Sequence, residues 1–155
     1  MDYSLALKEA KNLCRKFEGL RLSPYLCPAG IPTIGYGSTY YTNGKKVSMK
    51  DTPINRTVAE QILEYNLMTV YLPGVLARCP GLTDYRLAAI LDFAYNLGVT
   101  RFKGSTLAKY LEAKEWGKAS EEIKKWNKAG GRILKGLVLR RELESQLLLK
   151  EIPHV

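Results

Sequence analysis

The fold of this chain is constrained most by residues 20–50, where proline and glycine recur too often for a long helix. Within this stretch, aromatic and β-branched residues favour short strands, and Asn43-Gly44 is typical of a hairpin turn. We therefore expect a small three-stranded antiparallel sheet. Gly35 and Gly37 would leave one face of a strand without side chains, which indicates either the close approach of a ligand or backbone or a simple packing need.

Helical periodicity precedes this stretch. The first helix should cover residues 4–17, with Asp2 or Ser4 as its cap, and Gly19 should end it. Its apolar residues recur at three- and four-residue spacing, so one face should be buried. That face would hold Leu5, Ala6, Ala10, Leu13, Cys14 and Phe17.

Helical patterns also follow the stretch. The apparent capping box Thr57–Glu60 predicts the start of the longest helix, which Pro73-Gly74 should kink or end before a short piece reaches Cys79. Further helices are expected at 83–97, 105–114, 116–128 and 137–150. The last of them should bury an apolar face made of Leu139, Leu143, Leu147 and Leu148.

These elements predict an α+β protein, and a chain of 155 residues is long enough for one ordinary core. We expect a single domain, residues 1–155, with a small antiparallel β lobe at about 18–55. A larger helical lobe should comprise about 80–155 together with residues 1–17. The long helix would join the two lobes, with a cleft between them.

The three cysteines are too few for a disulfide scaffold, and they show no metal-ligand spacing. Cys14 and Cys79 fall on predicted helices, where a thiol is usually part of the core. The only histidine, His154, stands at the end of the chain. We therefore expect neither a metal nor a cofactor.

Glu18 is the only acidic residue between Glu9 and Asp51. It falls at the last turn of the first predicted helix, where the helix dipole disfavours a carboxylate by about 0.3–1 kcal/mol. A solvated surface glutamate is the default interpretation. An isolated acid beside an acid-free strand region is also a candidate for proton transfer.

The residues after Glu18 add a characteristic spacing, because eight residues separate it from Cys27 and five more separate Cys27 from Thr33. This spacing resembles the active-site pattern of phage-type lysozymes, in which Glu, Asp or Cys, and Thr occur at the same intervals. Two later blocks also resemble that family, in the same order, so the resemblance spans residues 18–142. The blocks are Asn96–Gly98 with Phe102 and Ser105–Leu107, and Trp126 with Ala129–Gly131, Gly136-Leu137 and Arg140–Glu142.

The resemblance implies that Glu18 is the general acid of a glycoside hydrolase and that Cys27 and Thr33 hold the attacking water. Cys27 stands where many relatives have Asp, and a thiol with a pKa of about 8.5 is mostly neutral at pH 7. Cys27 would therefore either support catalysis or merely fill the place of a dispensable Asp. Tyr95 and Asn96 are candidate sugar contacts, although Asn96 equally fits a helix cap.

The net charge of +9 is spread over both halves of the chain and favours a polyanionic partner: nucleic acid, anionic lipid or a bacterial envelope. From Lys124 to Arg141 there are seven basic residues and no acid. Such a run is by default a solvated face, and its functional interpretation is a patch that holds the protein on an anionic envelope. Arg140 and Arg141 would either orient Glu18 or, as is more usual, face solvent.

By this resemblance the protein is an endolysin, a monomer that cuts the β-1,4 bond between N-acetylmuramic acid and N-acetylglucosamine in bacterial peptidoglycan. We expect no nucleic-acid partner and no stable membrane insertion. No signal peptide is visible, which predicts storage in the host cytoplasm and release through a holin. Two alternatives remain open. They are a lytic transglycosylase, for which Thr33 would have no water to hold, and a non-catalytic basic module that binds an envelope.

Overall fold

The computed structural model describes residues 2–150, so His154 lies outside the described range. Within that range the protein is an α+β structure, mostly helical with small antiparallel sheets, as the sequence predicted. None of the described helices is both long and apolar enough to cross a membrane. The elements are α1 (Ser4–Glu18), β1 (Arg21–Leu26), β2 (Pro32–Gly35), α2 (Arg56–Asn66), the π-helix η1 (Leu67–Tyr71), α3 (Leu72–Arg78), α4 (Asp84–Leu97), α5 (Val99–Lys103), α6 (Thr106–Glu112), α7 (Trp116–Ile123), β3 (Lys128–Ala129), β4 (Arg132–Ile133) and α8 (Lys135–Leu149).

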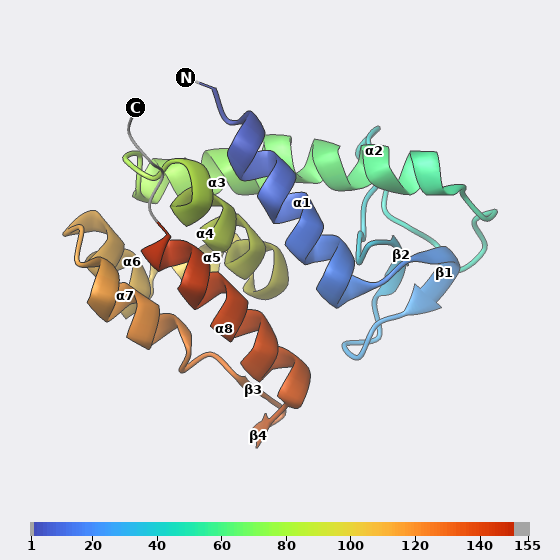
Figure 1. The fold of residues 1–155 in the computed structure, drawn as a ribbon. Helices are drawn as coiled ribbons and strands as arrows, with labels where there is room; N and C mark the ends of the chain where they lie inside the picture. Colours follow the sequence, from blue (N-terminus) through green and yellow to red (C-terminus); the bar gives the residue numbers. More distant parts are fainter. Residues whose placement is uncertain (1, 151–155) are drawn as a thin grey trace.

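Helix α4 forms the centre of the core, because every residue from Leu87 to Ala94 is buried. Helices α1 and α8 pack against it. The strands β1 and β2 lie at one side of the molecule, and α4 to α8 lie at the other (Figure 1). Glu18, at the end of α1, is therefore placed where the helices meet the sheet.

The sheet of residues 20–50 is smaller than the sequence predicted. It has two antiparallel strands, β1 and β2, and the expected third strand is reduced to isolated bridges, one of them between Tyr40 and Lys46. The chain turns directly after β2 because Gly35 and Gly37 have positive φ angles of 67° and 78°. The turn at Asn43-Gly44 is confirmed, since the Gly44 amide donates to the Tyr41 carbonyl at 3.0 Å.

The long central helix begins differently from the prediction. Asn55 is its N-cap, with its side chain accepting a hydrogen bond from the Val58 amide at 2.8 Å, and the capping box at Thr57–Glu60 is wrong. Glu60 instead pairs with Arg15 of α1, at 2.6 and 2.7 Å. The N-cap residue of the first helix is Tyr3, not Asp2 or Ser4, and it makes no side-chain cap; the Asp2 side chain accepts a hydrogen bond from the Ser4 amide at 2.8 Å.

This helix also passes through Pro73 without ending. A widened π-helical turn, η1, comes just before Pro73, with the Leu72 amide donating to the Leu67 carbonyl. Proline has no N–H to donate to an α-helical hydrogen bond. The π-helical turn η1 therefore lies just before Pro73. Elements α2, η1 and α3 therefore form one helical spine from Arg56 to Arg78.

For the last helix, α8, the sequence predicted the wrong buried face. Leu139 is exposed and Leu148 alone of the four predicted leucines is buried. The residues that α8 buries with it are mostly polar or charged: Arg140, Arg141, Glu144 and Ser145. Helix α7, expected to reach 128, ends at Ile123, and the β3–β4 hairpin occupies the space between the two helices in the sequence.

Candidate active site

Glu18 is the last residue of α1, and Gly19 follows it with a φ of 71°. One carboxylate oxygen, Oε2, accepts a hydrogen bond from Arg140 Nη1 at 2.7 Å. The other, Oε1, faces Gly37: a Cβ built on Gly37 would stand 2.6 Å from it. Gly37 is therefore a close-approach glycine. A Cβ on Gly35 would meet Ala59 at an ordinary 3.5 Å, so Gly35 serves packing and the turn.

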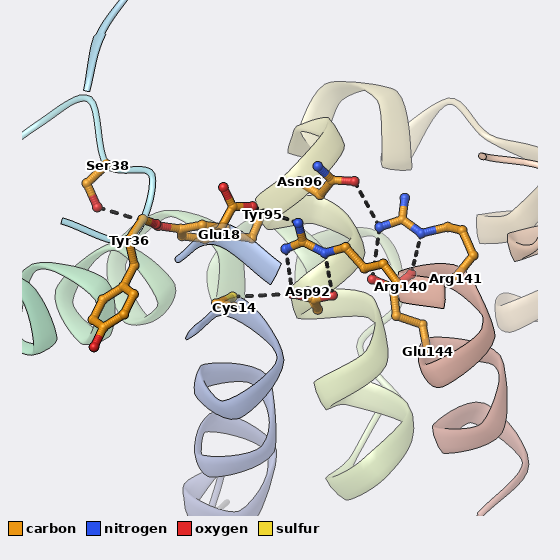
Figure 2. Close-up of polar contacts among 10 residues, drawn as sticks. All are labelled: Cys14, Glu18, Tyr36, Ser38, Asp92, Tyr95, Asn96, Arg140, Arg141 and Glu144. Carbon is orange, nitrogen blue, oxygen red and sulfur yellow. Dashed lines mark hydrogen bonds and ion pairs between the residues drawn. The ribbon is translucent and has the colours of Figure 1, made fainter. Parts of the chain in front are cut away.

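Arg140 links Glu18 to a buried acid that the sequence analysis did not single out. It binds Asp92 through two hydrogen bonds, of 2.9 and 2.7 Å, while its third bond goes to Glu18 (Figure 2). Burial acts to lower the pKa of Arg140, but the hydrogen bonds and charges of Asp92 and Glu18 raise it well above its ordinary value. Arg140 is thus a permanent cation that holds Glu18 against α4.

Asp92 is fully buried on α4 and depends on this pairing. Burial tends to raise its pKa, but the hydrogen bonds to Arg140 outweigh burial and hold the pKa below its usual value. The Cys14 thiol donates to Asp92 Oδ1 at 3.4 Å. Burial raises the pKa of Cys14, so the thiol stays protonated, and the prediction that Cys14 belongs to the core is confirmed.

Arg141 does not contact Glu18. Its Nη2 donates to Asn96 Oδ1 at 2.9 Å and to Glu144 Oε2 at 3.1 Å (Figure 2). Burial, with the charge of Asp92 nearby, raises the pKa of Glu144 well above its ordinary value. The interpretation that Arg140 and Arg141 face solvent is wrong for both, because both are buried.

Cys27 and Thr33 are brought together by the β1–β2 hairpin. Thr33 pairs in register with Tyr25 and is buried, and its hydroxyl donates to the Ile31 carbonyl at 2.8 Å. Cys27 is partly exposed. The backbone amides of Ile31 and Ala29, together with the Thr33 hydroxyl, lower the pKa of the Cys27 thiol. A lowered pKa favours the thiolate form of Cys27, and a thiolate accepts a hydrogen bond from water better than a thiol does.

Tyr25 lies opposite Thr33 on the hairpin, and the sequence analysis did not single it out. Burial raises the pKa of the Tyr25 hydroxyl, and the charges of Glu18 and Cys27 raise it further. The Arg21 guanidinium stacks on the Tyr25 ring at 4.4 Å from the centroid. Because paired residues share one face of a hairpin, the Tyr25 and Thr33 side chains lie on the same face.

A cleft of about 440 Å³ lies between the loop that follows β2 and the helical spine. Glu18 is not among its lining residues, but Gly37, which Glu18 approaches, is. Gly37 and Tyr95 both line it, as do Tyr40, Tyr65 and Tyr71. The Tyr95 hydroxyl donates to the Tyr36 carbonyl across the cleft, and its ring lies 5.1 Å from that of Tyr71. The structure therefore places Tyr95 in the cleft. Asn96 instead directs its side-chain oxygen to Arg141, and it does not cap the helix.

The arrangement is that of a lysozyme-like protein: a helix-end carboxylate is fixed by a buried arginine and faces a glycine that lines a cleft between the loop after β2 and the helical spine. The comparison with protein families agrees, because the model of the phage lysozyme family matches residues 15–144. The chain belongs to the phage lysozyme family.

Individual relatives support the assignment. The endolysin of Acyrthosiphon pisum secondary endosymbiont phage 1 is 38% identical over 140 residues, which cover 87% of this chain and 91% of that protein. The endolysin of Bacillus phage B103 is 37% identical over 143 residues, covering 89% of this chain. The chain spans only 51% of the length of that second relative. Among solved structures, the endolysin from Escherichia coli O157:H7 phage FAHEc1 superposes with a TM-score of 0.82 at 30% identity, covering 98% of this chain and 96% of that one.

Proposed function

We propose that this protein is a peptidoglycan hydrolase that cuts the β-1,4 bond between N-acetylmuramic acid and N-acetylglucosamine. The observation that carries the proposal is the Glu18 carboxylate, held by Arg140 at 2.7 Å and placed beside Gly37 at the cleft. Membership of the phage lysozyme family and relatives named endolysins give the substrate class. The reaction needs no metal or cofactor.

Glu18 would act as the general acid. Arg140 occupies Oε2, which leaves Oε1, on the side of Gly37, to carry the proton to the leaving glycosidic oxygen. Once the proton has left, the new carboxylate is stabilised by the charge-assisted bond from Arg140. Asp92 keeps the guanidinium in place throughout, because two of its hydrogen bonds end there.

Cys27 and Thr33 would position the attacking water. The Thr33 hydroxyl donates to Ile31, so its lone pairs can accept a hydrogen bond from water, and the Cys27 sulfur, whose pKa is lowered, can accept another. Tyr95 would contact the sugar from the helical side of the cleft. Asn96 would take part only after giving up its bond to Arg141.

The decisive experiment replaces Glu18 by glutamine, which keeps the shape and removes the transferable proton. We expect clearing of permeabilised cells to slow by about 10²–10⁴-fold with the melting temperature nearly unchanged, since general acid catalysis contributes that much. Glu9→Gln, on the same helix, is the matched control and should remain active. A folded Glu18→Gln protein with native lytic rate would contradict the assignment.

Product analysis separates the alternatives. Hydrolysis yields a reducing sugar, whereas a lytic transglycosylase yields a 1,6-anhydro sugar, which mass spectrometry of digested peptidoglycan distinguishes. A non-catalytic envelope-binding module would release neither product. We expect the reducing product, because the adjacent Thr33 and Cys27 suit a positioned water.

The remaining parts of the proposal concern the whole molecule. We propose that it works as a monomer and as one lysozyme-like domain, with a β lobe at about 18–55 and a helical lobe at about 80–155 together with residues 1–17. It would bind peptidoglycan and no nucleic acid, without stable insertion into the membrane. It would be held in the host cytoplasm until a holin opens the way to the cell wall. Sedimentation of the purified protein tests the first of these statements.

A further inference from the structure

The run of basic residues from Lys124 to Arg141 does not form one patch in the structure. Arg140 and Arg141 are buried, and Lys124 and Lys125 pair with the neighbouring acids Glu121 and Glu122. Three cations of the run stay exposed and outside any ion pair among the described residues: Lys128, Arg132 and Lys135. All three lie on or directly after the β3–β4 hairpin.

This hairpin is fully in solvent. Every residue from 128 to 136 is exposed, on both strands and in the turn. Figure 1 shows it projecting beyond the first turn of α8, away from the helices. Gly130 and Gly131 form its two-residue loop with positive φ angles of 58° and 77°, the sign that a type I′ turn requires at both positions. It is a tight, defined protrusion.

Large apolar side chains share this protrusion. Ile133, at 63%, has the largest exposed fraction among the exposed large hydrophobic residues of the described chain, and it pairs with Lys128 across the hairpin. Because paired residues share a face, the apolar group and the cation point the same way. On α8, Lys135, Val138 and Leu139 have the i, i+3, i+4 spacing of one helix face, and Val138 and Leu139 are 43% and 48% exposed.

We propose that the β3–β4 hairpin and the first turn of α8 form a docking surface for a bilayer that carries anionic phospholipids. Exposed aliphatic groups interleaved with unpaired cations match the two layers of such a surface, the acyl boundary and the phosphate headgroups. A bilayer offers acyl chains to Ile133, Val138 and Leu139, whereas peptidoglycan offers them only small apolar groups such as acetyl methyls. Trp126 contributes nothing to this surface, because it packs against Phe93 with ring centroids 5.4 Å apart.

The surface is separate from the proposed catalytic residues. Glu18, at the end of α1, contacts Arg140 and faces Gly37. Among the described residues, no side chain from 128 to 139 makes a hydrogen bond to any of these three residues. The inference therefore holds or fails independently of the muramidase proposal, and binding can be measured without any catalytic readout.

The test is co-sedimentation with vesicles of phosphatidylglycerol and phosphatidylcholine, and with pure phosphatidylcholine. The native protein should sediment with the anionic vesicles and should not sediment with the neutral ones. The triple variant Lys128→Gln, Arg132→Gln, Lys135→Gln should bind anionic vesicles about 100-fold more weakly, at about fivefold for each cation. The control triple Lys8→Gln, Lys103→Gln, Lys109→Gln removes the same charge from exposed positions elsewhere. It should stay within about threefold of the native protein, because distant charges are screened.

The apolar part is tested by Ile133→Ser, which should weaken binding about tenfold, with Met68→Ser as the matched control at another exposed site. Melting temperatures and the rate on a soluble oligosaccharide should be native in all four variants. Equal loss in the two triples would overturn the proposal, since net charge would then explain binding. Loss of binding to purified peptidoglycan, with vesicle binding intact, would also overturn it by making the hairpin a wall-binding surface.

Discussion

At the scale of single residues, substitutions of Gly37 and Gly35 test an effect on the active site apart from an effect on packing. Gly37→Ala would push a Cβ to 2.6 Å from Glu18 Oε1, whereas Gly35→Ala would make ordinary contacts, with Ala59 at 3.5 Å and Ile54 at 3.8 Å. Both have positive φ, so both substitutions should cost about 1–2 kcal/mol of stability. We expect only Gly37→Ala to lower the lytic rate, by at least tenfold, in assays run well below both melting temperatures. An equal loss of rate in both would show that strain alone disturbs the site.

The cysteines give a second prediction at this scale. Cys27 is partly exposed and has a lowered pKa, while Cys14 and Cys79 are buried with raised pKa values. A thiol reagent near pH 7.5 should therefore label Cys27 first, which peptide mass spectrometry can follow. Cys27→Ser should lower the lytic rate, and Cys27→Asp should keep or raise it, because Asp restores a charge at the water site. Full activity of Cys27→Ser with rapid labelling of Cys14 would show that the thiol is only filler.

At the scale of elements, α8 is held to α4 by the ion pair of Arg140 with Asp92, and α8 also buries an acid of its own, Glu144, beside Arg141. Glu144 and Arg141 are both fully buried, and burial raises the pKa of Glu144. A raised pKa in the folded state means that Glu144 favours folding at low pH. This contribution is lost as the pH rises from the unfolded value of about 4.3 towards the folded one.

Glu144→Gln should therefore become more favourable, relative to the native protein, as the pH increases from 5 to 8. Urea unfolding across this range measures the effect, which is at most about 1.4 kcal/mol per pH unit. Glu142→Gln, exposed on the same helix, should show no such trend. If the penalty of Glu144→Gln instead grew with pH, Glu144 would have to be ionised and paired with Arg141.

At the scale of the whole molecule, the charge of +9 governs encounter with an anionic wall. Salt screens such attraction, with a Debye length of about 8 Å at physiological ionic strength. The lytic rate on cell walls should thus fall steeply as NaCl increases, while the rate on a soluble neutral oligosaccharide should change little. The same salt response on both substrates would place the effect in the active site and not in wall attraction.

The sequence alone determined the features that depend on neighbours along the chain. Helix periodicity, the glycine-rich turn and the short spacing from Glu18 to Thr33 are local, so the helix positions and the α+β class were predictable. The family blocks extended this to a lysozyme-like fold. Two local expectations were wrong: the structure caps the long helix with Asn55, and it has isolated bridges where a third strand was expected.

Only the tertiary structure decided which charges are buried. Arg140 reaches Glu18 across 122 positions and Asp92 across 48, and no periodicity records such pairings. Asp92 stood unremarked within an apolar stripe, and the leucines of α8 suggested a buried face that the arginines in fact occupy. A buried charge is tolerated only where a partner from another element compensates its desolvation, and the position of that partner exists only in the folded chain.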